Sequence, residues 1–117
     1  MHVLVVDDDL MVRRLMADCL HEAGYHVREA GNAADAMASI EHDDSLELVV
    51  TDVRMPGEMD GFALSHWLKQ RLPATKVLVV SGYAGRDPAH GPVWDAFLAK
   101  PFTARALELA VCSVMGS

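Results

Sequence analysis

Residues 2–24 read HVLVVDDDLMVRRLMADCLHEAG and contain a strand-and-helix pattern that recurs along the chain. Its first five residues form a short apolar run, which predicts a buried β-strand from His2 to Val6. Apolar residues then recur at helical spacing from Leu10 to Ala23, and Gly24 supplies a C-terminal stop. The positions predicted to face inward are Val12, Leu15, Met16, Cys19, Leu20 and Ala23. A buried strand followed by a helix with one apolar face is the repeating unit of α/β folds.

The same unit recurs along the rest of the chain. Further strands are predicted at His26 to Ala30, Glu47 to Thr51, Lys76 to Val80 and Asp95 to Ala99. The helices between and after them are predicted to turn inward Ala33, Ala36, Met37 and Ile40, then Leu64, Trp67, Leu68 and Leu72, then Leu107, Ala110, Val111 and Val114. Asn32 and Thr103 are predicted N-caps. Strands rich in Val and Leu that alternate with helices predict a five-stranded parallel, doubly wound α/β sheet.

Length and composition fit one soluble globular domain. The 117 residues are 51% hydrophobic and 23% charged, with a mean hydropathy of +0.14. This composition is too apolar for a disordered tail. Because no apolar run approaches about 18 residues and the N-terminus lacks signal-peptide features, we expect a cytoplasmic protein without a membrane interaction. The two cysteines are too few for a disulfide framework.

The charge balance argues against binding to nucleic acid. Seventeen acidic residues exceed ten Lys and Arg residues, which leaves a formal net charge of -7. The basic residues are scattered, and only Arg13 and Arg14 are adjacent. Because phosphate contacts need a clustered positive face, we expect no direct nucleic-acid binding by this chain.

Polar residues with chemical potential follow four of the predicted strands. Asp7 and Asp8 follow the first, Asp52 the third, Ser81 the fourth and Lys100 the fifth. Singly, each fits a helix cap, a turn residue or a solvated charge. Together they meet at the carboxyl edge of a parallel sheet, where two carboxylates 4 Å apart repel by about 4 kcal/mol at an effective dielectric near 20. Such a cluster needs a cation, and oxygen ligands that remain partly hydrated suit Mg²⁺.

Four motifs in this order carry a family resemblance. They are residues 3–9 (VLVVDDD), residues 48–61 (LVVTDVRMPGEMDG), Ser81-Gly82, and residues 97–102 (FLAKPF). The chain resembles the receiver domain of two-component response regulators, the CheY-like family, over essentially its whole length. The resemblance implies one receiver domain over residues 1–117 and a flavodoxin-like sheet with strand order 2-1-3-4-5.

The resemblance also implies a role for each residue at the strand ends. Asp52 is similar to the aspartate that accepts a phosphoryl group from a phosphohistidine. The Lys100 ammonium and the Ser81 hydroxyl would contact phosphoryl oxygens, and the Lys100–Pro101 peptide would be cis. Asp9 would cap the first helix. The implied Mg²⁺ ligands are Asp7, Asp8, Asp52 and the main-chain carbonyl of Arg54.

Several positions depart from the commonest receiver pattern. The implied switch residues are Ser81 and Phe97, and Phe97 has no phenolic hydroxyl. Arg54 places a long cation two residues beyond the acceptor, and Glu58 is an apparent extra loop residue. The breakers Gly85, Pro88, Gly91 and Pro92 lie where the fourth helix is expected. Because Pro costs roughly 3 kcal/mol inside a helix, we expect that helix to be short or irregular.

The functional expectation is a phosphorylation-controlled signalling module that catalyses only its own phosphorylation and dephosphorylation. Its partners would be a sensor histidine kinase or phosphotransfer protein and an unknown output partner, with the chain a monomer or weak homodimer. An aspartyl-phosphate phosphatase of the haloacid dehalogenase type would need an aspartate where Arg54 stands. A pseudo-receiver that only binds partners would not need the complete acidic, hydroxyl and lysine set. The sequence leaves two questions open. The first is whether the chain stands alone or is part of a longer regulator. The second is whether Trp94 packs over the fifth strand or contacts a partner.

Overall fold

The computed structural model describes residues 2–42, 45–53, 60–82 and 94–116, with Ser81 described in its backbone alone. In this part of the chain, strands and helices alternate from His2 to Ser81, and a fifth strand and a fourth helix follow. The strands are β1 His2–Val6, β2 His26–Ala30, β3 Leu48–Thr51, β4 Lys76–Ser81 and β5 Ala96–Ala99. The helices are α1 Leu10–Glu22, α2 Ala33–His42, α3 Gly61–Arg71 and α4 Ala104–Met115. No described helix is long and apolar enough to cross a membrane.

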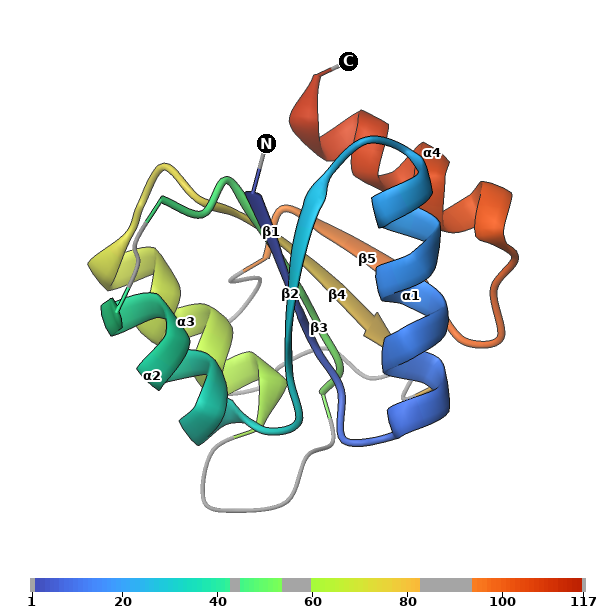
Figure 1. Cartoon of the computed structure of the whole chain (residues 1–117). Coiled ribbons are helices and arrows are strands. Elements are labelled where there is room, and N and C mark those ends of the chain that lie inside the picture. The colour runs from blue at the N-terminus through green and yellow to red at the C-terminus, as the bar shows by residue number, and fades with distance from the viewer. Residues whose placement is uncertain (1, 43–44, 54–59, 83–93, 117) are drawn as a thin grey trace.

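The five strands form one parallel sheet in the order β2-β1-β3-β4-β5, as predicted (Figure 1). β1 lies between β2 and β3, so the chain reverses its direction of travel across the sheet after β2. Ligands bind at such a switch point, outside the carboxyl ends of the strands. Asp7 and Asp52 directly follow the two strands that meet there.

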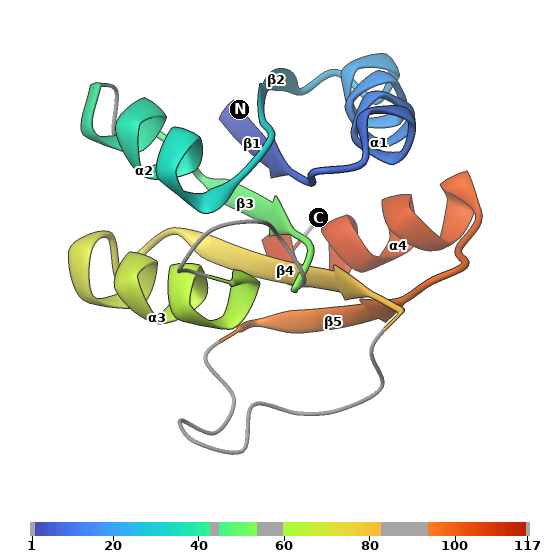
Figure 2. The same ribbon diagram turned by 90° about the horizontal axis from the view of Figure 1, so that it is seen from below.

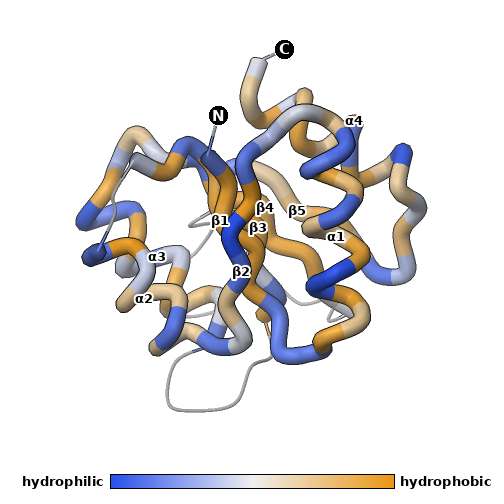
Figure 3. Tube along the Cα trace, in the orientation of Figure 1, coloured by the Kyte–Doolittle hydropathy of each residue, from blue (hydrophilic) through white to orange (hydrophobic). Residues whose placement is uncertain are grey.

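Helices cover both faces of the sheet. Figure 2, which looks from below, places α2 and α3 on one side of the strands and α1 and α4 on the other. Two buried apolar clusters correspond to these two layers, and β1, β3 and β4 are strongly hydrophobic along the trace, whereas β2 is largely hydrophilic (Figure 3). Because both faces are covered, β3 is buried along its whole length and β1 along all but its first residue.

Side-chain caps begin the helices where the sequence predicts them. Asn32 accepts a hydrogen bond from the Asp35 amide at 2.8 Å, and Thr103 accepts one from the Ala106 amide at 3.0 Å. Gly24 follows α1 with φ of 99°, a left-handed conformation that glycine adopts at little cost. These predictions are local and are confirmed.

The strand predictions differ from the structure by one residue at three ends. Glu47 and Asp95 precede their strands, and Ser81 extends β4. Asp95 exchanges two hydrogen bonds with Val77 but uses its side chain for one of them, so regular pairing begins one residue later.

The inward face predicted for α1 is wrong at Leu15 and Ala23. Leu15 is 60% exposed and Ala23 is also exposed, whereas Ala17 is buried. The buried face of α1 centres on Met16 and Leu20, which pack into the core. Leu15 lies just beyond one side of this face, and Ala17 lies within its opposite side. The inward positions predicted for the other three helices are buried or pack against a core cluster.

Two predictions concern residues outside the described part of the chain. The helix expected between the fourth and fifth strands, predicted to be short or irregular, falls on residues 83–93. The loop with Arg54 and Glu58 falls on residues 54–59. Both remain predictions.

Candidate functional site

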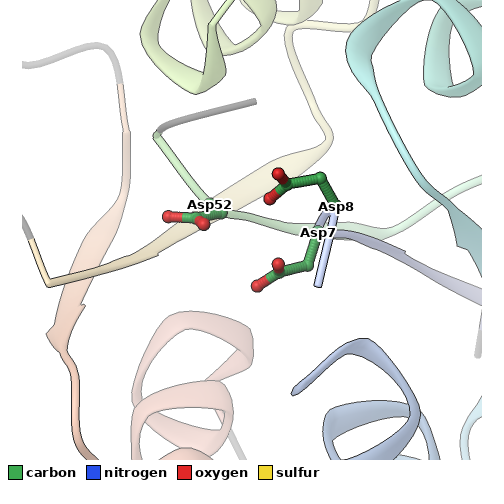
Figure 4. A group of neighbouring side chains, drawn as sticks. All are labelled: Asp7, Asp8 and Asp52. Carbon is green, nitrogen blue, oxygen red and sulfur yellow. The ribbon is translucent and has the colours of Figure 1, made fainter. Parts of the chain in front are cut away.

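Three carboxylates gather at the carboxyl ends of β1 and β3. One oxygen from each of Asp7, Asp8 and Asp52 can be chosen so that all lie within 4.8 Å of one another (Figure 4). Asp7 is fully buried and Asp52 nearly so, whereas Asp8 is exposed. The predicted convergence of these side chains is confirmed, and it produces a buried acidic site with one side open to water.

Lys100 joins this cluster from the far end of β5. Its Nζ lies 3.0 Å from Asp7 Oδ2 and 3.2 Å from Asp52 Oδ2, so a single ammonium bridges both buried carboxylates. The Lys100 side chain is only 23% exposed. The Lys100–Pro101 peptide is cis, as the resemblance implied.

Backbone amides hold the remaining oxygens of the two buried carboxylates. Asp7 Oδ1 accepts a hydrogen bond from the Asp9 amide at 2.9 Å, and Asp52 Oδ1 accepts one from the Val53 amide at 2.7 Å. These bonds orient each carboxylate before any ligand arrives. The free-energy cost of orienting the two carboxylates when a ligand binds is therefore small.

Burial and charge shift the pKa values of Asp7 and Lys100. Burial raises the pKa of Asp7 above its usual value, against the lowering effect of its hydrogen bonds from Asp9 and Lys100. Burial alone would lower the pKa of Lys100, but the hydrogen bond to Asp7 and the charges of Asp7 and Asp52 outweigh it and raise that pKa. Lys100 therefore remains an ammonium at neutral pH.

The donor set of this site suits Mg²⁺. All three side chains supply carboxylate oxygens, the hard ligands that Mg²⁺ prefers. The exposed Asp8 leaves room for the water ligands that Mg²⁺ retains. The carboxylates carry three formal negative charges against the one positive charge of Lys100, so an added divalent cation would improve the local charge balance.

Asp9, the third aspartate of the run, lies outside this group. Its Oδ1 accepts hydrogen bonds from the Met11 and Val12 amides at 3.0 and 3.3 Å, which caps α1 as predicted. The cap ties the start of α1 to the end of β1. A helix therefore begins directly beside the acidic cluster.

Gly61 is a residue of the site that sequence reasoning missed. It begins α3 against the backbone of the acceptor segment, and its amide donates to the Val53 carbonyl at 2.8 Å. A Cβ at this position would lie 1.9 Å from the Asp52 carbonyl oxygen. The sequence signals were a glycine after the α3 N-cap Asp60 in a loop rich in breakers and its place at the end of the motif at residues 48–61, and neither signal specifies a contact.

The predicted switch residues occupy β4 and β5. Ser81 ends β4 and pairs with Ala99, while its side chain lies outside the described part. Phe97 is half-buried on β5, and its ring lies 6.0 Å from that of Trp94, which stacks on Phe62 at 5.2 Å. Trp94 therefore packs between α3 and β5, which supports the packing interpretation of this residue.

Comparisons with known proteins agree with this geometry. The sequence model of the response regulator receiver domain matches residues 3–112. The chain is similar to the response regulator receiver protein CpdR of Brucella abortus (strain 2308), with 34% identity over 108 residues that cover 90% of this chain and 88% of CpdR. It is 38% identical over 113 residues to the sensor kinase CckA of the same organism, which covers 93% of this chain and 12% of CckA.

A solved structure shares the fold. The CheY-like receiver domain protein from Methanospirillum hungatei JF-1 superposes with a TM-score of 0.88 and 28% identity, covering 98% of this chain and 93% of that one. The chain spans less than half the length of several other curated relatives that it matches. The sheet order, the acidic cluster with its lysine and the family match lead to one conclusion: this chain belongs to the response regulator receiver domain family, the aspartate-phosphorylated signalling modules of two-component systems.

Proposed function

We propose that Asp52 is the phosphoacceptor of this receiver domain. The observation that carries the proposal is the Lys100 ammonium, which bridges Asp52 and Asp7 although 48 and 93 positions separate it from them in the sequence. A phosphoryl group transferred to Asp52 adds negative charge beside two buried carboxylates, and Lys100 is a cation within reach to offset that charge. Asp52 is the bridged carboxylate that follows the central strand β3.

The transfer step follows from these groups. A carboxylate oxygen of Asp52 attacks the phosphorus of a phosphohistidine, and a P–O bond forms while the P–N bond breaks. The electron pair of the broken bond stays on the imidazole nitrogen of the donor. The Lys100 ammonium then leaves a carboxylate oxygen and contacts a phosphoryl oxygen. The Ser81 hydroxyl donates a hydrogen bond to another phosphoryl oxygen.

Asp7, Asp8, Asp52 and the main-chain carbonyl of Arg54 are the proposed Mg²⁺ ligands. Bound Mg²⁺ would offset negative charge on the phosphoryl oxygens during transfer. Asp7 and Asp8 supply the oxygens next to the acceptor, and the Asp9 amide keeps the buried Asp7 carboxylate in place.

The test is the intact mass of the chain after incubation with acetyl phosphate. With Mg²⁺ present, we expect the mass to rise by one phosphoryl group. With the metal removed by a chelator, we expect labelling to fall at least tenfold. Equal labelling with and without Mg²⁺ would contradict the proposed metal site, and no labelling from any phosphodonor would contradict the proposed acceptor.

Asp8→Ala is expected to weaken Mg²⁺ binding by about tenfold or more, because it removes a direct oxygen ligand. Asp9→Ala is the matched control. It removes the α1 cap and costs about 1 kcal/mol of stability, but leaves the ligands in place. An NMR titration with Mg²⁺ measures both affinities. Equal losses would mean that the roles of the two neighbouring aspartates are misassigned.

The rest of the proposal concerns the wider module. Residues 1–117 act as one receiver domain that catalyses only its own phosphorylation and dephosphorylation, in the cytoplasm, as a monomer or weak homodimer. A sensor histidine kinase or a phosphotransfer protein supplies the phosphoryl group, and Ser81 and Phe97 transmit the modified state to an output partner. The charge of -7 supports a partner other than nucleic acid.

An exposed apolar surface beside the site fits the approach of the phosphohistidine protein. Leu10, Met11 and Leu15 at the start of α1 are 55%, 82% and 60% exposed, and α1 begins directly after the acidic run. A protein that delivers its phosphohistidine to Asp52 must cover the neighbouring surface. Apolar side chains there supply binding energy that a small phosphodonor does not need.

Met11→Gln is therefore expected to slow phosphotransfer from a histidine kinase that phosphorylates the unaltered chain, by about tenfold. Labelling by acetyl phosphate should remain within twofold of the unaltered chain. Leu109→Gln on α4 is the control, because Leu109 is also an exposed apolar residue, at 57%, but lies on a different helix. Equal slowing of both donors would show a damaged site instead of a lost docking contact.

A further inference from the structure

Arg13 is a half-buried cation beside the acidic cluster that the proposed chemistry does not use. Its Nη1 donates to the main-chain carbonyl of Asp7 at 3.0 Å, and its Nε donates to Glu29 Oε1 on β2 at 3.1 Å. Its side chain is 19% exposed. Arg14 pairs with the same Glu29 oxygen at 3.6 Å, but its side chain is 67% exposed. The two adjacent arginines thus share one carboxylate, and Arg13 alone of the pair hydrogen-bonds the backbone of the acidic run in the described part of the chain.

The carbonyl that Arg13 holds belongs to the peptide that joins Asp7 to Asp8. A peptide unit is planar, so fixing this oxygen also constrains the amide and the Cα of Asp8. The neighbouring backbone is already tied, because the Asp7 amide donates to the Ala30 carbonyl at 3.1 Å and the Asp9 amide to Asp7 Oδ1. Asp8 is exposed, so burial does not set its direction. The position of its carboxylate therefore depends on the backbone beneath it.

The acceptors and the space around Arg13 fit a guanidinium. A planar guanidinium can donate to two acceptors in fixed directions at once, which an ammonium cannot do in the same geometry. Gly31 lies close to the same head group, since a Cβ there would be 3.2 Å from Nη1. Glu29 and Gly31 flank the last residue of β2. Glu29 binds the Arg13 head group, and Gly31 leaves space beside it.

We infer that Arg13 is a positioning residue that holds the Asp7–Asp8 peptide, and through it the Asp8 carboxylate, in the arrangement that binds Mg²⁺. Glu29 orients the guanidinium, and Gly31 leaves space for it. The inference rests on the Mg²⁺ site of the proposed function. It adds a residue that touches neither the metal nor the phosphoryl group.

The sign of the effect separates positioning from electrostatics. Arg13 carries a positive charge close to three carboxylates, so a purely electrostatic role predicts that its removal strengthens Mg²⁺ binding. Positioning predicts the opposite, because Asp8 would lose its fixed direction. A role limited to overall stability predicts an unchanged Mg²⁺ affinity of the folded chain. The three roles therefore give three different results in one titration.

The experiment is an NMR titration of the full chain with Mg²⁺, following the amide signals of the acidic run. We expect Arg13→Gln to lower the Mg²⁺ affinity about tenfold, in the range typical of residues that support metal ligands. Arg13→Lys should lose affinity in the same direction, since it keeps the charge but not the fork. Arg14→Gln is the control with the same charge change, and its affinity should stay within twofold or rise.

Gly31→Ala provides a second variant that retains Arg13. Its added Cβ should displace the guanidinium by a few tenths of an ångström and weaken Mg²⁺ binding measurably, which keeps the test decisive if Arg13→Gln does not fold. An affinity of Arg13→Gln equal to or above that of the unaltered chain would overturn the inference. If Arg13→Gln does not fold, an unchanged affinity of Gly31→Ala would overturn it. Failure of the unaltered chain itself to bind Mg²⁺ would refute the proposed metal site as well.

Discussion

Replacing Asp52 by Asn is expected to abolish phosphorylation, with labelling reduced more than about a hundredfold, equivalent to about 3 kcal/mol of transition-state stabilisation. The amide has no carboxylate oxygen to attack phosphorus and cannot form an acyl phosphate. The fold should survive, because the amide oxygen can still accept the Val53 hydrogen bond and the change removes one of three clustered negative charges. Intact mass after incubation with acetyl phosphate and Mg²⁺ measures the result.

Asp60→Asn is the matched control for this variant. Asp60 Oδ1 caps α3 by accepting a hydrogen bond from the Ala63 amide at 2.8 Å. Asn caps helices about as well as Asp, so the same chemical change should leave both folding and labelling intact. Full-stoichiometry labelling of Asp52→Asn would overturn the assignment of the acceptor.

Gly61→Ala is expected to destabilise the protein by about 2 to 3 kcal/mol. The new Cβ would lie 1.9 Å from the Asp52 carbonyl oxygen, 2.7 Å from the Asp52 carbonyl carbon and 2.9 Å from the Val53 Cα. All three neighbours are backbone atoms, so no side chain can turn away to relieve the contact. Either α3 or the acceptor segment must move. Thermal unfolding should show a Tm lower by about 10 °C.

Gly82→Ala is the control for the loss of glycine. A Cβ at Gly82 would meet no atom within 4 Å, and its φ lies outside the left-handed region. Its stability should change by less than about 0.5 kcal/mol. Equal Tm values for Gly61→Ala and the unaltered chain would mean that α3 can begin without touching the acceptor backbone.

Most of the fold was predictable because its determinants are local. The apolar runs that became β1 and β3 are short and lack charge, and the caps Asp9, Asn32 and Thr103 act within three residues of their own position. Hydrogen bonds of such short range need no tertiary information. The strand ends were less predictable, since Asp95 uses a side chain where a regular strand would use backbone.

The members of the site were predictable for a different reason. Carboxyl ends of parallel strands meet at one edge, so residues directly after strands come together whatever their distance in the sequence. Asp7, Asp52 and Lys100 directly follow strands and Asp8 comes one residue later, and the structure brings them together as expected. Their pattern also matched the family motifs residue by residue.

The order of strands and helices, the capping residues and the charged groups at the strand ends all follow from the amino-acid sequence, since each depends on neighbours within one element or on the polarity of a parallel sheet. The packing of α1 against the rest of the fold sets which of its sides is buried, and this packing leaves Leu15 and Ala23 exposed. Tertiary structure likewise placed Gly61 against the Asp52 backbone and the Arg13 guanidinium on the Asp7 carbonyl. These contacts depend on how separate elements pack, and a packing distance of a few ångströms leaves no periodic signal in the chain.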